Sequence, residues 1–262
     1  MPPAWADGRG RAANPNRVGS LHRNAGTLGH DEVAVWWLAT EASTPADWRR
    51  WLLLLDHDER QRAARFGLEL DRREFIAAHA LLRTMLAFYL ARPAAAWRFC
   101  ADAEGKPAVA AETASPACQF NISHTRGLVT AAVATHGRIG IDVERIDETK
   151  ADFSVAETYF APSEVALLQS MPESQRPVWF FRLWTLKEAY LKAIGTGLGA
   201  PLQSFAFDFN PIRISFASGG DDPNRWHFAM LPAGDQHVLS LAIDRSSGTV
   251  RVVPRAVAAQ DI

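Results

Sequence analysis

Apolar residues form a short run and then helical repeats in the first third of the chain. The run Val33–Ala39 is apolar throughout and contains two tryptophans, which predicts a buried strand. Thr44 followed by Pro45 is typical of a helix start, with Thr44 as the N-cap and proline at the first helical position. That helix is expected to continue past residue 55 toward the basic stretch at 60–65. Apolar residues recur at helical spacing in Arg72–Leu90, and a proline ends this second helix.

Beyond residue 93 the pattern changes to short alternating runs separated by turn residues, which predicts strands. These runs are Trp97–Cys100, Ala108–Ala111, Gln119–Ile122, Leu128–Thr135, Ile139–Val143, Phe205–Phe209, Ile212–Phe216, Trp226–Leu231 and Val238–Ile243. Between them, Ser154 and Glu157 have the spacing of a capping box and indicate a helix start. A long helix is predicted at Val178–Ile194, which Gly195 ends.

The order of a long helix, strands and a hairpin occurs twice, in Arg72–Asp142 and in Val178–Asp244. We therefore predict the α+β class, with two similar α/β subdomains in a pseudo-twofold arrangement. A doubly wound parallel sheet is disfavoured, because helices and strands do not alternate one for one. The predicted division is a disordered tail at 1–30, an N-terminal subdomain at 31–144, a C-terminal subdomain at 145–250 and a C-terminal tail at 251–262.

Composition indicates a water-soluble globular protein and excludes several classes. Of the 262 residues, 48% are hydrophobic and 22% charged, which is ordinary for a folded domain. The net charge of −1 favours neither nucleic acid nor membrane as a partner. Two cysteines are too few for a disulfide framework, and no run approaches the roughly 18 apolar residues of a membrane span. We expect a cytoplasmic protein.

The stretch Gly140–Glu144 contains two carboxylates at alternate positions of a predicted strand. Asp142 and Glu144 therefore point to the same face, where their charges repel. A divalent cation such as Mg²⁺ would remove that cost, because it prefers oxygen ligands. The alternative is that both side chains face solvent at the edge of a sheet.

Glu188 and Lys192 are four residues apart on the predicted long helix, so they share a face. This spacing also fits an ordinary surface ion pair. Phe181 and Trp184 lie on the preceding turns, which favours a partly buried carboxylate with a function.

A third polar segment ends the predicted strand at 119–122. Ser123 and His124 offer hydrogen-bond donors of the kind that bind phosphate. Lys106 lies in a Gly-Lys-Pro turn, and Arg62 and Arg73 belong to an arginine cluster in the helical region. That cluster is equally typical of the solvated face of a helix.

Taken together, these segments resemble the 4′-phosphopantetheinyl transferases of the large, pseudo-dimeric, surfactin-synthetase-activating type. The family motifs F-N-[IL]-S-H-[ST], G-[IV]-D-x-E and W-[ST]-x-K-E-[AS]-x-x-K match Phe120–Thr125, Gly140–Glu144 and Trp184–Lys192, in that order. The resemblance covers about residues 33–245. The N-terminal tail lies outside the family pattern.

The resemblance implies an enzyme that moves the phosphopantetheine arm of coenzyme A to a serine of a carrier protein, releasing 3′,5′-ADP. It implies Asp142, Glu144 and Glu188 as Mg²⁺ ligands. Lys192 would contact the phosphates. Glu188, with Glu144 as the competitor, would accept the proton of the serine hydroxyl.

Further roles follow from the same resemblance. Ser123 and His124 correspond to contacts with the 3′-phosphate of coenzyme A, and Lys106, Arg62 and Arg73 to other basic phosphate contacts. Carrier docking is expected beside the cleft, on Arg145–Phe160. Because the duplication would build the cleft within one chain, a monomer is expected.

Two other functions remain open at this point. One is a metal-dependent phosphohydrolase or nucleotidyl-transfer enzyme that uses the same carboxylates. The other is a non-catalytic module that binds coenzyme A or a carrier. The presence of all three presumed metal ligands and of Lys192 argues against an inactive site.

Overall fold

The computed structural model describes residues 26–262, apart from 103–104, 112, 114–117, 218 and 246–247. The expected disordered tail at 1–30 therefore lies mostly outside the described residues. Its last part belongs to the fold, because Leu28 is buried in the core of the first half. Within the described ranges, no helix is both long and apolar enough to cross a membrane.

The described residues form six α-helices, α1 (Pro45–Leu54), α2 (His57–Ala63), α3 (Glu69–Leu90), α4 (Phe153–Tyr159), α5 (Pro162–Ser170) and α6 (Arg176–Ile194). Capping side chains mark the starts of α1, α2 and α4. Thr44 caps α1 as predicted, since its side chain accepts a hydrogen bond from the amide of Asp47. The expected continuation of this helix toward residues 60–65 is wrong, because Asp56 caps a separate helix, α2.

Antiparallel pairing dominates two main sheets. The strands are β1 (Glu32–Ala39), β2 (Phe99–Ala101), β3 (Pro107–Val109), β4 (Gln119–Thr125), β5 (Leu128–Ala134), β6 (Ile139–Arg145), β7 (Phe205–Phe209), β8 (Ile212–Phe216), β9 (Trp226–Leu231), β10 (His237–Asp244) and β11 (Arg251–Val257). The first sheet has the order β11-β1-β5-β4 and the second the order β6-β10-β9. Two hairpins, β2-β3 and β7-β8, stand apart from them.

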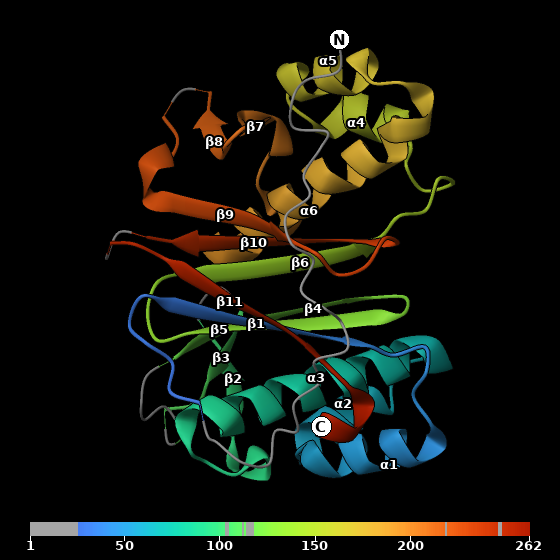
Figure 1. Ribbon diagram of the computed structural model, residues 1–262, viewed down its shortest axis with the longest axis vertical. Coiled ribbons are helices and arrows are strands. Elements are labelled where there is room, and N and C mark those ends of the chain that lie inside the picture. The colour runs from blue at the N-terminus through green and yellow to red at the C-terminus, as the bar shows by residue number, and fades with distance from the viewer. Residues whose placement is uncertain (1–25, 103–104, 112, 114–117, 218, 246–247) are drawn as a thin grey trace.

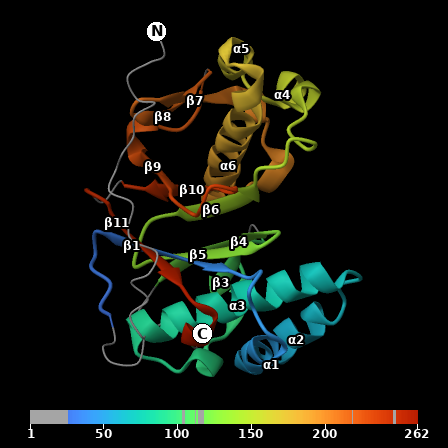
Figure 2. The same cartoon turned by 45° about the vertical axis from the view of Figure 1, so that its right-hand side comes forward.

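The two main sheets stack in the middle of the molecule, with helices on both outer sides (Figures 1 and 2). One core lies between α1–α3 and the first sheet, around Trp36, Trp51 and Leu81. A second lies between α4–α6 and the second sheet. The inner faces of the two sheets form a third core, which includes Val35 and Ile141. The α+β class predicted from the sequence is confirmed.

The duplication is visible in the sheet topology, although each repeat begins at a different element from the one predicted. Each unit begins with a strand, continues through a long helix and a hairpin, and ends with two more strands. In both units the first strand pairs with the last, which pairs with the one before it: β1-β5-β4 and β6-β10-β9. The repeats therefore start at β1 and β6, rather than at the long helices.

Strand pairing contradicts two of the predicted boundaries. The strand β6 was assigned to the N-terminal subdomain ending at 144, but it pairs with β10 of the second half. The segment 251–262 is no tail, because β11 pairs in parallel with β1. Pro254 interrupts the pattern that would have predicted a strand here. An edge strand such as β11 tolerates a proline. After β11, the carbonyl of Ile262 accepts a hydrogen bond from Arg50 of α1.

Candidate active site

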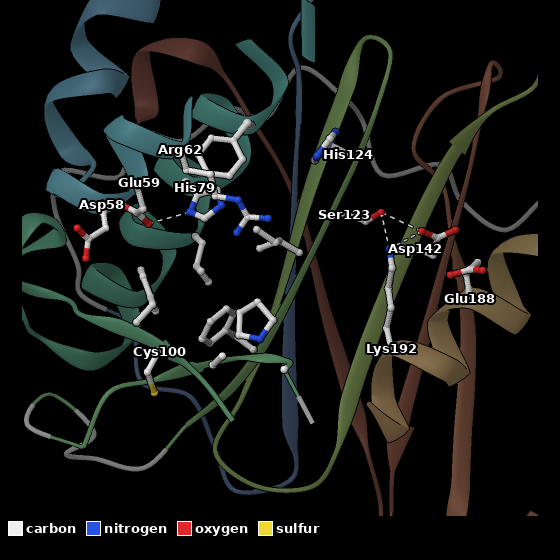
Figure 3. A pocket seen from close by; sticks show the side chains of 18 of the residues that line it. Asp58, Glu59, Arg62, His79, Cys100, Ser123, His124, Asp142, Glu188 and Lys192 are labelled. Carbon is white, nitrogen blue, oxygen red and sulfur yellow. Dashed lines mark hydrogen bonds and ion pairs between the residues drawn. The ribbon is translucent and has the colours of Figure 1, made fainter. Parts of the chain in front are cut away.

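A cavity of about 730 Å³ lies where the two halves meet, and side chains from both enter it (Figure 3). The first half contributes α2, α3, the β2-β3 hairpin and β4, and the second contributes β6 and α6. Most of the residues singled out in the sequence line this cavity: Arg62, Ser123, His124, Asp142, Glu144, Glu188 and Lys192. Lys106 and Arg73 do not.

Close packing of α6 on β6 brings the carboxylates together. Gly140 begins the motif on β6, and a Cβ at this position would lie 2.0 Å from the carbonyl oxygen of Ala189. Only glycine therefore lets the helix backbone approach this closely. Asp142 and Glu144 follow on the cavity face of β6, as the alternation predicted. Helix α6 places Glu188 beside Asp142 (Figure 3).

Burial and repulsion by Asp142 raise the pKa of the two glutamates at the site. Burial, reinforced by the charge of Asp142, raises the pKa of Glu144 to about 7. The same two causes raise the pKa of Glu188. Among the described residues, Asp142 Oδ2 and Glu188 Oε1 are buried without a hydrogen-bond partner. Oxygen atoms of this kind fit a hard divalent cation such as Mg²⁺.

The carboxylates do not yet surround a common point. Across the described part of the chain, no three His, Cys, Asp or Glu side chains stand close enough together to hold a metal ion. Instead, the ammonium group of Lys192 lies 2.6 Å from Asp142 Oδ1 and 2.9 Å from Ser123 Oγ. Lys192 therefore pairs across to β6, and the surface ion pair with Glu188 that the spacing allowed is not the arrangement found.

Ser123 and His124 lie side by side on β4 but differ in their surroundings. Ser123 is buried, and its hydroxyl donates to Asp142 Oδ1 at 2.9 Å. His124 is more exposed, and its Nδ1 lies 3.6 Å from Glu74 Oε2. The amide of Gly127 also donates to Glu74, so one buried carboxylate contacts both the histidine and the β4-β5 turn.

Two of the predicted phosphate contacts lie elsewhere. The Lys106 ammonium donates to the carbonyl oxygens of Ile139 at 2.7 Å and Ala193 at 3.3 Å, and it lines a neighbouring cavity of about 390 Å³. Burial lowers the pKa of Lys106 to about 8. Arg73 pairs with Glu69 and lines a separate depression of about 270 Å³. Neither the Gly-Lys-Pro turn of Lys106 nor the arginine cluster of Arg73 indicated the direction that these side chains take.

At the far end of the cavity, Arg62 is joined by Phe75, His79 and Glu59, which were not among the site residues predicted from the sequence. Arg62 stacks on the Phe75 ring, whose centroid lies 4.0 Å from that of His79. The His79 ring bonds to Glu59 at 2.7 Å. Behind them Arg83 is fully buried and pairs with Glu59. The sequence did contain a signal for these residues, namely charged residues within the apolar pattern of Arg72–Leu90. A charge at a buried position requires a partner, which predicts a buried ion pair.

Comparison with known proteins assigns both halves to one family. The family model described as 4′-phosphopantetheinyl transferase superfamily matches residues 138–242, and the one described as 4′-phosphopantetheinyl transferase, N-terminal matches residues 40–136. The two matches meet at the turn before β6, which agrees with the division seen in the sheets.

Several named proteins are similar over most of their length. The 4′-phosphopantetheinyl transferase HetI of Nostoc sp. is 36% identical, over 71% of this chain and 77% of its own. A putative 4′-phosphopantetheinyl transferase of Synechocystis sp. is 31% identical, over 68% and 72%. The human L-aminoadipate-semialdehyde dehydrogenase-phosphopantetheinyl transferase is 25% identical, over 78% and 72%.

Among solved structures, the Thermotoga maritima holo-[acyl-carrier-protein] synthase matches 44% of this chain and 66% of its own. The identity is 23% and the TM-score 0.35. The assignment depends instead on the two family models and on the extent of the match to the Nostoc relative. The chain belongs to the 4′-phosphopantetheinyl transferase superfamily.

Proposed function

We propose that this protein transfers the phosphopantetheine arm of coenzyme A to a serine hydroxyl of a carrier protein, with Mg²⁺ held by Asp142, Glu144 and Glu188. One observation carries the proposal beyond family membership. Two carboxylates from β6 and one from α6 line a single cavity between the halves, and two of their buried oxygens lack hydrogen-bond partners within the described residues.

The chemistry required is positioning and charge neutralisation. The serine oxygen attacks the phosphorus that carries the pantetheine arm, and the bond from that phosphorus to 3′,5′-ADP breaks. When bound, Mg²⁺ supplies positive charge to the diphosphate. Glu188 is our preferred acceptor for the serine proton, and Glu144 is the alternative. Lys192, once released from Asp142, offers its ammonium group to the leaving phosphates.

The residues that line the cavity suit a ligand with phosphate groups and an aromatic ring. His124 lines the cavity between the carboxylates and the far end, Arg62 lies at the far end (Figure 3), and each can donate to a phosphate. The rings of Phe75 and His79 form an aromatic wall on which an adenine ring would stack. Ser123 is less suited to a phosphate, because its hydroxyl proton is donated to Asp142.

A mass measurement tests the reaction directly. The protein is incubated with Mg²⁺, coenzyme A and an apo carrier, and the carrier is then weighed by mass spectrometry. We expect a gain equal to the pantetheine arm, lost with a chelator and in Asp142→Ala. Release of inorganic phosphate without a mass gain would favour a phosphohydrolase. Binding of coenzyme A without turnover on several carriers would favour a non-catalytic module.

We also propose that the protein acts as a monomer, since both walls of the cavity come from one chain. Light scattering at micromolar concentration tests this, and a dimer would contradict it. The cytoplasmic location expected from the sequence stays a prediction.

A further inference from the structure

The two main sheets present facing edges at the active site. β4 is the last strand of the first sheet, and β6 is the first strand of the second. The two strands lie next to each other, but their backbones are not paired (Figures 1 and 3). Buried backbone amides at such an edge need acceptors from another source.

Side chains of β4 supply those acceptors at every second residue. The bonds run from the Ile141 amide to Asn121 Oδ1 (2.8 Å), from the Val143 amide to Ser123 Oγ (3.4 Å) and from the Arg145 amide to Thr125 Oγ1 (3.3 Å). The spacing along the chain is 20 residues in each case. We call these three β4 residues the side-chain ladder. It takes the place of backbone pairing between the halves.

Two members of the ladder also contact the acidic residues. The Ser123 hydroxyl donates to Asp142 Oδ1 at 2.9 Å, and the Thr125 hydroxyl donates to Glu144 Oε2 at 3.2 Å. A hydroxyl has one proton to donate and two lone pairs to accept. In each case the backbone amide of the residue after the acidic residue donates to the hydroxyl oxygen. The hydroxyl proton is therefore donated to the carboxylate. Both hydroxyls are thus oriented by the β6 backbone.

We propose that Ser123 and Thr125 are positioning residues that hold Asp142 and Glu144 in place on the cavity wall, and that Ser123 serves this role rather than contact with coenzyme A. The inference rests on the proposed function in so far as the two carboxylates bind a metal ion. Asp142 is also held by the Lys192 ammonium group, whereas within the described residues the Thr125 hydroxyl is the hydrogen-bond donor to Glu144. Without the hydroxyls, repulsion between the two carboxylates would move Glu144 away and leave Asp142 to Lys192 alone.

Hydrogen exchange measured by NMR tests the ladder itself, independently of any activity. In Ser123→Ala the amide of Val143 loses its acceptor, and we expect its exchange to accelerate at least about tenfold. The amide of Asp142 points to the opposite edge of β6 and should change little. Equal acceleration at both amides, or none at Val143, would overturn the ladder.

Binding of Mn²⁺ in the presence of coenzyme A tests the positioning role. The free Mn²⁺ signal is followed by electron paramagnetic resonance and corrected for Mn²⁺ bound by coenzyme A alone. For Ser123→Ala and Thr125→Val we expect about 10- to 100-fold weaker binding, the usual effect of losing a residue that orients a metal ligand. Thr125→Ser keeps the hydroxyl and should bind as the unmodified protein does.

Thr130→Val is the matched control. Its buried hydroxyl lies on β5 opposite Ser123 and donates to the Trp36 carbonyl, not to a carboxylate. We expect a loss of stability with unchanged Mn²⁺ affinity. Unchanged Mn²⁺ affinity in Ser123→Ala, with a raised KM for coenzyme A, would overturn the proposal and return Ser123 to coenzyme A binding. If the unmodified protein fails to modify any carrier while the exchange result holds, only the proposed function fails.

Discussion

Replacement of Gly140 by alanine tests how the two halves of the site are brought together. A methyl group there would lie 2.0 Å from the Ala189 carbonyl oxygen and 2.4 Å from the Ala193 amide nitrogen, both in the backbone of α6. Carbon–oxygen contacts normally begin near about 3.3 Å. The helix must therefore move away by more than about 1 Å, and it carries Glu188 and Lys192 with it.

Two consequences of that shift are measurable. Overpacking of this kind costs about 1–3 kcal/mol of unfolding free energy, measured by urea denaturation. A misplacement of about 1 Å at the reacting groups reduces the rate about 100-fold. The rate is measured as carrier mass gain with time, at saturating coenzyme A.

Gly199→Ala is the matched control, because nothing lies within 4 Å of an added Cβ at that position and its backbone is unstrained. We expect it to retain both rate and stability. A Gly140→Ala protein that unfolds cooperatively and modifies the carrier within twofold of the normal rate would refute the argument that contact between α6 and β6 sets the site.

Four further predictions concern charged groups. Lys187 is fully buried, 2.8 Å from Glu164. We expect Lys187→Met to lower the free energy of unfolding, measured by urea denaturation, by about 3–5 kcal/mol, because it leaves the Glu164 charge buried and unpaired. The double variant Lys187→Met with Glu164→Gln should recover part of this loss. Burial raises the pKa of Glu144 from 4.5 to about 7, so the folded metal-free protein binds this proton more tightly than the unfolded chain does. Its stability should therefore fall as pH rises from about 4.5 to 7, and Glu144→Gln should flatten this slope in chemical denaturation. Lys106→Met should lower stability by about 1–3 kcal/mol without raising the KM for coenzyme A, since its bonds go to backbone carbonyls; a raised KM alone would restore it as a phosphate contact. Arg145→Glu should slow carrier modification and leave coenzyme A affinity unchanged if an acidic carrier docks there; equal rates at low salt would contradict this.

Local sequence determined the parts of the site that depend on backbone period. Alternation along a strand placed Asp142 and Glu144 on one face, and helical spacing placed Glu188 and Lys192 on another. Both predictions hold in the structure, because the direction in which successive side chains point depends only on the backbone of the strand or helix itself. The N-cap at Thr44 and the glycine end of α6 were predictable for the same reason.

Only the tertiary structure decided which edges and faces meet. No local signal says that β6 pairs with β10, or that β11 returns to β1 from more than two hundred residues away. Nor does a cluster of arginines reveal that Arg62 turns into the cavity while Arg73 pairs with Glu69. The physical reason is that strand pairing and side-chain direction follow from burying apolar faces against distant partners. The period of a segment determines its own faces, and the packing of the whole chain determines what each face contacts.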